Sequence, residues 1–310
     1  MALDINGYVL PDGFTTANAG MCQWGFAEKN GHSYFIKEFL SPKYPLDEGK
    51  LGPELTRRMR DNADAFFEKK SAFYNRLGQC RTGNNMIILH FFRFGSKYYA
   101  VSDRVRGRQL SIEEIAVLPK DQKLTLLLAI LYSMASLHRA GIVHSDLRPE
   151  NILVTATRNG YCTAKLIDFD AGFLEGQMPD QIEGSQNYFS PEAVEHIHGE
   201  AVPVTTKSDV WALGLLIHQF WCGRLPDFDE KYHYASEAVL DGSSLTLDPS
   251  IPLDILLIVD KMLRRFPEER PTAQEVWQAL RNLNSGEKPI VPAPGPVDTS
   301  SGFSIPDDLD

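Results

Sequence analysis

The sequence predicts an α+β fold with a strand-rich first part and a mostly helical second part. Residues 1 to 105 alternate short runs of β-type residues with turn signals, apart from one helical stretch. From Leu124 onward the character changes, and apolar residues recur at helical spacing. A chain of 310 residues with 43% hydrophobic composition is long enough for one large or two medium domains with a sizeable core.

The predicted strands of the first part form a small five-stranded antiparallel sheet with one main helix. The turns Pro11-Asp12-Gly13 and Lys29-Asn30-Gly31 separate the first three strands, and Gly95-Ser96 closes a final hairpin. Residues 54–77 have helical periodicity, and Pro53 suits the first turn of that helix. The predicted strands are Tyr8–Leu10, Met21–Ala27, Ser33–Phe39, Met86–Phe94 and Lys97–Val105.

The second part opens with a strongly apolar stretch, Leu124–His138, which predicts a buried core helix. Gly141 ends this stretch, as glycine commonly does at a helix C-terminus. Two short runs of β-type residues, Ile152–Thr155 and Thr163–Ile167, then predict a hairpin. The candidate catalytic acids lie on the flanks of this hairpin.

Composition excludes several classes of protein. The formal net charge of −10 and the pI of about 5.3 argue against a nucleic-acid binder, whose binding face is basic. The four cysteines form no C-x-x-C pair, which favours free thiols in a reducing compartment over a zinc site or disulfides. The N-terminus carries no basic secretory region, and the apolar runs fall short of the roughly 18 residues of a membrane span. We therefore expect a cytoplasmic protein with no membrane span.

Two polar residues five positions apart carry the predicted chemistry. Asp146 and Asn151 lie in a loop interrupted by Pro149 that leads into a β-type run. A carboxylate can accept the proton of an attacking hydroxyl, and an amide oxygen can hold a metal ion that neutralises phosphates. Asp168 follows a second predicted strand and adds another metal ligand. The pattern predicts phosphoryl transfer with one base and two metal ligands.

These residues resemble the catalytic motifs of protein kinases. Residues 144–151 read H-S-D-L-R-P-E-N against the family's H-R-D-L-x-x-x-N, and residues 168–170 read D-F-D against D-F-G. Three later stretches, residues 184–192, 208–214 and 267–272, resemble the kinase motifs G-T-x-x-Y-x-A-P-E, S-D-V-W-S-L-G and D-P-x-x-R-P-T. These later motifs distinguish protein kinases from small-molecule phosphotransferases, which share the catalytic centre.

The resemblance covers roughly residues 7 to 283 and implies a bilobal protein-kinase-like fold. It implies an N-lobe over residues 1–105 and a C-lobe over residues 106–284. Residues 285–310, which are rich in proline and acids, are then a disordered tail or linker. The structural braces that the resemblance implies are a Glu192–Arg270 ion pair and an Asp209 contact to the catalytic loop.

ATP and Mg²⁺, or alternatively Mn²⁺, are the cofactors that the resemblance implies. In these terms Asp146 is the base, while Asn151 and Asp168 hold the metal. Arg148, where the serine/threonine branch has lysine, stabilises the transferring phosphoryl group. Lys37 ends the run Y-F-I-K, which resembles the V-A-I-K strand whose lysine grips the α- and β-phosphates.

The predicted adenine site departs from the family pattern. Phe35 stands where the family has alanine, and it faces the same side of the strand as Lys37 because it is two residues away. Its ring must stack on the adenine, displace it or fill its pocket. Only Gly20 remains of the glycine-rich loop that covers the nucleotide phosphates. The other residues implied at this site are the small gatekeeper Ser102, the hinge residues Asp103 and Val105, and Leu153.

The helix of residues 54–77 is expected to supply a glutamate that pairs with Lys37. Glu68 is the first candidate, because it lies in an apolar stripe that includes Phe66 and Phe67. Glu54 is the alternative, since it is closer to Lys37 along the chain. If Glu68 is the partner, about a dozen residues before the helix are an insertion.

Two features predict that the segment after Asp168 is not switched by phosphorylation. Ser145 replaces the family arginine that binds a phosphorylated activation segment, and residues 169–184 contain no Ser, Thr or Tyr. Acids such as Asp180 and Glu183, or a partner protein, are expected to order the segment instead. Asp170 replaces the glycine of D-F-G, and it either enlarges the metal site or caps a turn.

Three functions compete for this sequence. The first is a serine/threonine protein kinase, divergent enough to suggest a bacterial source, whose substrate is a protein hydroxyl. Ser185 at the substrate-facing turn and the R-P-E-N spelling favour serine or threonine as the acceptor. A pseudokinase scaffold with impaired nucleotide binding and a small-molecule phosphotransferase remain the alternatives.

Overall fold

The structure, a computed structural model, describes residues 2–17, 22–46, 52–105, 109–156 and 162–285. Within these residues the chain divides into two compact units. The first unit holds the described residues up to Arg81 together with Met86–Val105, and the second holds Thr82–Asn85 and the residues from Gln109 onward. Gly20 and the predicted tail beyond residue 285 lie outside the described residues.

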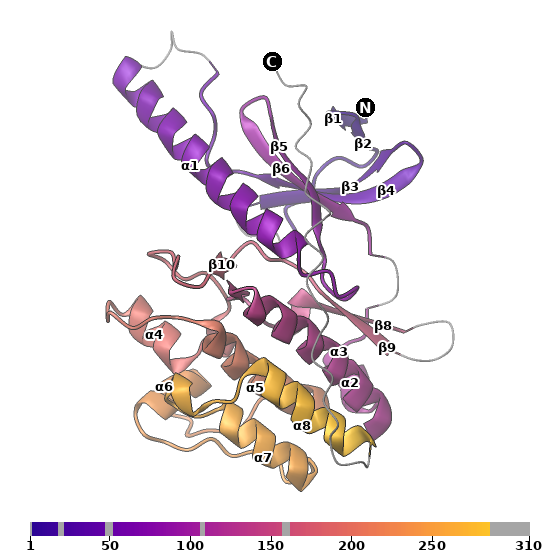
Figure 1. The fold of residues 1–310 in the computed structure, drawn as a ribbon, viewed down its shortest axis with the longest axis vertical. Coiled ribbons are helices and arrows are strands. Elements are labelled where there is room, and N and C mark those ends of the chain that lie inside the picture. Colours follow the sequence, from indigo (N-terminus) through magenta and orange to yellow (C-terminus); the bar gives the residue numbers. More distant parts are fainter. Residues whose placement is uncertain (1, 18–21, 47–51, 106–108, 157–161, 286–310) are drawn as a thin grey trace. The chain divides into compact units, whose positions relative to one another are not determined.

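The first unit contains an antiparallel sheet of six strands in the order β1-β2-β3-β4-β6-β5 (Figure 1). The prediction of five strands is therefore wrong by one, because β1 was missed. β1 and β2 are joined by Asn6-Gly7, whose φ angles of 52° and 82° suit the tight turn that Asn-Gly favours in hairpins. The strands are β1 (Leu3–Ile5), β2 (Tyr8–Leu10), β3 (Cys22–Lys29), β4 (His32–Phe39), β5 (Ile88–Phe94) and β6 (Lys97–Asp103).

Helix α1 (Pro53–Gly78) packs on one face of this sheet through aromatic side chains. The ring of Phe66 lies 5.4 Å from that of Phe39 on β4 and 5.3 Å from that of Tyr98 on β6. Pro53 occupies the first turn of the helix, as predicted, where its missing N–H costs no intrahelical hydrogen bond. The opposite face of the sheet buries a second cluster of apolar side chains: Ile5, Tyr8, Leu10, Ala27, Ile36, Phe92, Tyr99 and Val101.

The second unit is mostly helical, as predicted (Figure 1). Its helix α5 (Thr206–Cys222) is buried along nearly its whole length, which explains why its residues are apolar on all sides. The other helices are α2 (Ile112–Ala116), α3 (Lys120–Arg139), α4 (Pro191–Ile197), α6 (Ala235–Leu240), α7 (Leu253–Met262) and α8 (Ala273–Ser285). The strands are β7 (Ile142–Val143), β8 (Ile152–Ala156), β9 (Cys162–Leu166) and β10 (Phe173–Leu174), and the short 3₁₀ helices are η1 (Pro149–Asn151), η2 (Gln186–Tyr188) and η3 (Pro267–Glu269).

Lys123 connects two helix ends inside the second unit. Its side chain is buried, and its Nζ donates a hydrogen bond of 2.9 Å to the carbonyl of Trp221 and another to the carbonyl of Ala116. These carbonyls lie at the C-terminal ends of α5 and α2, where intrahelical donors are missing. Burial lowers the pKa of the Lys123 ammonium. Among the described residues, no helix is both long and apolar enough to cross a membrane.

Candidate active site

The loop between β7 and η1 holds the predicted base next to the predicted metal ligand. Asn151 donates from Nδ2 to the Asp146 carboxylate at 2.8 Å and to the Asp146 backbone carbonyl at 2.8 Å. The other carboxylate oxygen of Asp146 accepts the backbone N–H of Ser185 at 3.0 Å. These hydrogen bonds fix the orientation of the carboxylate, as a general base requires.

Asp209, in the first turn of α5, holds the catalytic loop from inside the unit. Its carboxylate accepts the backbone N–H groups of His144 and Ser145 at 2.8 and 3.0 Å, and it contacts Nε2 of His138 at 3.0 Å. Ser145 has a φ of 68°, in the left-handed region that a serine rarely adopts. The Asp209 carboxylate stabilises this backbone conformation, and the predicted brace is confirmed.

A second set of contacts connects the catalytic loop to the residues that follow β9. The backbone N–H of Ile167 donates to the carbonyl of Asn151 at 3.0 Å. His144 contacts the carbonyl of Ile167 through Nε2 at 3.2 Å, and its ring centroid lies 4.7 Å from that of Phe169. Asp168 follows directly and has a φ of 58°. The residues on both sides of the half-buried Asp168 are therefore held by the catalytic loop.

The donor atoms present suit a hard divalent cation. The amide of Asn151 directs its Nδ2 toward Asp146, so its oxygen is turned the other way. An amide oxygen and a carboxylate such as that of Asp168 are ligands that Mg²⁺ accepts, usually with phosphate oxygens and waters completing the shell. Within the described residues, no group of three or more His, Cys, Asp or Glu side chains could hold a metal by itself. A metal at this site would therefore need further ligands, such as phosphate oxygens or waters.

The segment after Asp168 is anchored at several points without a phosphate. Its strand β10 pairs with β7, and Ser145 donates from Oγ to the carbonyl of Glu183 at 3.4 Å. The Glu175 carboxylate accepts both the N–H and the hydroxyl of Thr206 at 3.2 Å. The side chains of Asp180 and Glu183 are exposed, and their role in ordering the segment stays a prediction. Sequence reasoning missed Glu175, whose partner lies 31 residues away.

Tyr188 anchors the turn that presents Ser185. Its hydroxyl donates to Oε1 of Gln219 on α5 at 2.7 Å. Burial raises the pKa of Tyr188 well above its usual value, and the Glu150 carboxylate raises it further. The phenol is therefore neutral at physiological pH and remains a donor to Gln219.

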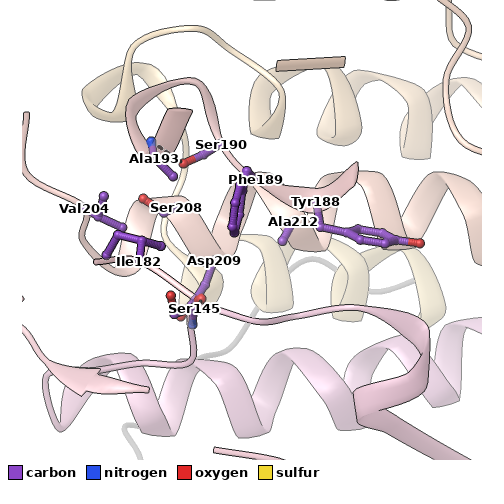
Figure 2. Close-up of a pocket in the computed structure, with 10 residues that line it drawn as sticks. All are labelled: Ser145, Ile182, Tyr188, Phe189, Ser190, Ala193, Val204, Ser208, Asp209 and Ala212. Carbon is purple, nitrogen blue, oxygen red and sulfur yellow. Dashed lines mark hydrogen bonds between the residues drawn. The ribbon is translucent and has the colours of Figure 1, made fainter. Parts of the chain in front are cut away.

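A small pocket lies beside Ser145, under the end of this segment (Figure 2). None of the residues that line it is Lys or Arg, so the pocket offers no cation to a phosphate group. Apolar contacts also hold the segment, since Phe173 and Phe189 pack with Val143 and Val204. The lining residues are Ser145, Ile182, Tyr188, Phe189, Ser190, Ala193, Val204, Ser208, Asp209 and Ala212.

Glu192 and Arg270 form the predicted buried ion pair. Two guanidinium N–H groups donate to the two carboxylate oxygens, both at 2.8 Å, and both side chains are at most 2% exposed. Ser208 also donates to this carboxylate at 2.6 Å. The remaining donors of Arg270 reach backbone carbonyls, including those of Arg264 and Arg265, so the buried charges have full hydrogen-bonding partners.

The predicted nucleotide-binding face of the first unit carries aromatic rings around Lys37. On β4, Phe35 and Lys37 lie on one face, and they are paired across the strands with Phe26 and Trp24 of β3. The ring of Phe35 stacks on Trp24 with centroids 5.6 Å apart and meets the edge of Phe26 at 6.2 Å. Ser102 lies directly opposite Phe35 on β6 and is 1% exposed. Sequence reasoning found Phe35 but missed Trp24, although both aromatic residues of β3 alternate toward this face.

Glu68 does not lie in the apolar stripe of α1, and that prediction is wrong. The stripe runs through Ala63, Phe67 and Tyr74, whereas Glu68 is exposed. Consecutive residues of a helix differ in direction by about 100°, so Glu68 points away although it follows two phenylalanines. The alternative Glu54 is exposed as well. The pairing of either glutamate with Lys37 stays a prediction.

The remaining residues predicted to contact the nucleotide are exposed or half-buried. Asp103 is exposed at the end of β6, Val105 follows it and is half-buried, and Leu153 is half-buried on β8. Nε of Arg148 lies 3.4 Å from the Glu150 carboxylate, and the two side chains are 35% and 66% exposed. An ion pair this exposed contributes little stability, so Arg148 is available for a phosphoryl group. Their roles in binding stay predictions.

Comparisons with known proteins agree with this arrangement. The family model described as the protein kinase domain matches residues 75–280. Sperm motility kinase Z of Mus musculus is 26% identical over 67% of this chain and 40% of its own length. Serine/threonine-protein kinase pkn2 of Myxococcus xanthus is 28% identical over 70% of this chain and 28% of its own length. Dual specificity protein kinase Ttk of Danio rerio is 33% identical over 56% of this chain and 18% of its own length. The chain thus spans less than half the length of these three relatives.

Proposed function

The chain belongs to the protein kinase family, and we propose that it transfers the γ-phosphate of ATP to a serine or threonine hydroxyl of a protein. The observation that carries the proposal is the hydrogen-bonded carboxylate of Asp146, held by Asn151 and by the backbone N–H of Ser185. A protein kinase domain implies the use of ATP and a divalent metal in general. The R-P-E-N spelling of the loop and a serine/threonine-protein kinase among the relatives support this acceptor class.

In this proposal Asp146 accepts the proton of the attacking hydroxyl. Asn151 and Asp168 hold Mg²⁺, or alternatively Mn²⁺, which neutralises charge on the phosphates. Lys37 binds the α- and β-phosphates, and Arg148 stabilises the transferring group. Arginine at this position offers a planar fork in place of the point charge of a lysine, so it can contact two oxygens at once.

We also propose that activity does not depend on phosphorylation of residues 169–184. The absence of acceptor side chains in this stretch supports the proposal, as does the hydrogen bond between Ser145 and the Glu183 carbonyl. Glu175 and the apolar packing of Phe173 supply the order that a phosphate otherwise provides. Treatment of the purified protein with a phosphatase is expected to leave its transfer rate unchanged, and strong activation by an upstream kinase would contradict the proposal.

The test of the transfer reaction is Asp146→Asn. The variant keeps the size of the side chain but removes the base, so kcat is expected to fall by about 10²- to 10⁴-fold. The dissociation constant of Mg²⁺–ATP is expected to stay within about twofold, which isothermal titration checks. A matched control is Asp254→Asn, an exposed acid on α7 that should change neither quantity. Acceptor peptides with Ser, Thr or Tyr, and a panel of small alcohols, identify the acceptor class.

A pseudokinase scaffold is the second candidate, and two observations favour it. The ring of Phe35 stands where the family has a small side chain. The two glutamates of α1 that could pair with Lys37, Glu54 and Glu68, are exposed. Thermal unfolding with and without Mg²⁺–ATP, alongside Asp168→Ala, separates the candidates. A ligand at 100 times its dissociation constant stabilises by about 2.7 kcal/mol, so a bound nucleotide gives a clear upward shift. A metal-dependent shift that Asp168→Ala removes supports the kinase, and no shift at millimolar nucleotide supports the scaffold.

A further inference from the structure

The side chain of Trp24 on β3 contributes to holding the segment Gly13–Ala17 against the sheet. Trp24 and Thr15 exchange two backbone hydrogen bonds of 2.8 and 2.9 Å. The indole Nε1 of Trp24 also donates to the carbonyl of Ala17 at 2.8 Å. The N–H of Ala17 donates in turn to Oγ1 of Thr15 at 3.2 Å. The indole therefore reaches two residues past the backbone pairing and holds the end of the segment.

Two further contacts show how closely this segment approaches the sheet. A Cβ added to Gly25 would lie only 2.6 Å from the carbonyl oxygen of Gly13. The two backbones can approach this closely because residue 25 is glycine. The ring of Phe14 stacks on Tyr99 with centroids 6.3 Å apart, and it packs against the core on the other face of the sheet. The segment is thus held from both faces, and the indole supplies the hold on the Lys37 face.

Trp24 connects this segment to the predicted nucleotide contacts. It is the residue directly opposite Lys37 across the β3–β4 pairing, and its ring stacks on Phe35. We propose that Trp24 is a positioning residue for the nucleotide, because its indole lies on the same sheet face as Lys37 and fixes the Ala17 end of the Gly13–Ala17 segment. The inference rests on the proposed function. A segment that is ordered before binding lowers the entropy lost when the ligand arrives, so its effect belongs in nucleotide affinity.

The substitution Trp24→Phe isolates the indole hydrogen bond. Phenylalanine keeps an aromatic ring for Phe35 to stack on, but it cannot donate to the Ala17 carbonyl. The KM for ATP is expected to rise about three- to tenfold, the range that corresponds to loss of one intramolecular hydrogen bond. The kcat is expected to stay within about twofold, because the catalytic loop is untouched. Trp277→Phe is the matched control, since this half-buried indole lies on α8 beside Tyr132.

A second variant tests the same hold without touching the ring. Thr15→Val is nearly isosteric and keeps the backbone pairing with Trp24, but it removes the hydroxyl that accepts the N–H of Ala17. Its KM for ATP is expected to rise in the same direction as that of Trp24→Phe, by a smaller factor. This variant keeps the inference testable if Trp24→Phe folds poorly.

The outcomes separate this inference from the proposed function. If the wild type transfers phosphate and both variants keep its KM, the inference is overturned and the function stands. A loss of kcat with unchanged KM also overturns it, since the indole then acts on the chemistry and not on nucleotide placement. If the wild type binds no Mg²⁺–ATP in titration, the proposed function fails first and the inference fails with it. Raised KM in both variants, with Trp277→Phe unchanged, supports the inference.

Discussion

The catalytic loop of the second unit and the Lys37 face of the first unit differ in how closely they follow the kinase pattern. In the catalytic loop, Asp146 and Asn151 stand at the family positions, and Asp209 holds the loop through two backbone N–H groups. On the Lys37 face, Phe35 presents a large ring where the family pattern has alanine, and it stacks on Trp24. Only Gly20 remains of the glycine-rich loop.

The difference teaches which demands of phosphoryl transfer are strict. A base and metal ligands act on single atoms, so a displacement of about 1 Å can cost much of the rate. A nucleobase that stacks on an aromatic ring has no such directional requirement, because every nucleobase offers a π-face. We therefore expect the catalytic loop to tolerate few substitutions and the Lys37 face to accept an aromatic contact in place of an aliphatic one.

The largest expected effect is on stability, through the buried ion pair of Glu192 and Arg270. Arg270→Met leaves the Glu192 carboxylate buried without its counter-charge, so the free energy of unfolding is expected to fall by about 3–5 kcal/mol. Urea denaturation measures the change. Arg264→Met is the control, because its ion pair with Asp260 is about half exposed and should contribute at most about 1 kcal/mol. Equal losses in the two variants would contradict a special role for the buried pair.

A smaller effect is expected on the Lys37 face. Phe35→Ala removes a ring that is backed by Trp24 and that we expect to stack on the base, so the affinity for Mg²⁺–ATP should fall by about 1–3 kcal/mol. Isothermal titration checks the direction as well as the size. Tighter binding in the variant would mean that the ring fills the base pocket, and the scaffold function would then gain support. Phe94→Ala, an exposed phenylalanine on β5, is the matched control.

The smallest effect is expected at Glu68. Its side chain is exposed on α1, so Glu68→Gln should change the free energy of unfolding by less than about 0.5 kcal/mol. Lys37→Met, measured in parallel, is expected to weaken nucleotide binding because the phosphates lose a cation. A large loss of transfer in Glu68→Gln would mean that α1 rotates to pair this glutamate with Lys37 during the reaction.

Much of the fold could be predicted because its signals are local. Turn residues marked the strand boundaries, and helical periodicity identified α1 and α3. The missed strand β1 also had a local signal, the Asn6-Gly7 turn, but strands of three residues are too short for a clear alternation. The Glu68 prediction failed for a different reason, since an apolar neighbour in the chain does not place a helical residue on the apolar face.

The sequence by itself placed Asp146 and Asn151 five positions apart in one loop, and in the structure the two side chains are hydrogen-bonded. The resemblance of its motifs to those of protein kinases also indicated the buried ion pair of Glu192 and Arg270. Only the tertiary structure decided that the Ser185 N–H meets Asp146, that Glu175 meets Thr206, and that the Trp24 indole meets Ala17. Such contacts depend on the direction in which each packed element presents its side chains. No spacing along the chain encodes that direction, because it follows from how the apolar faces of separate elements are buried together.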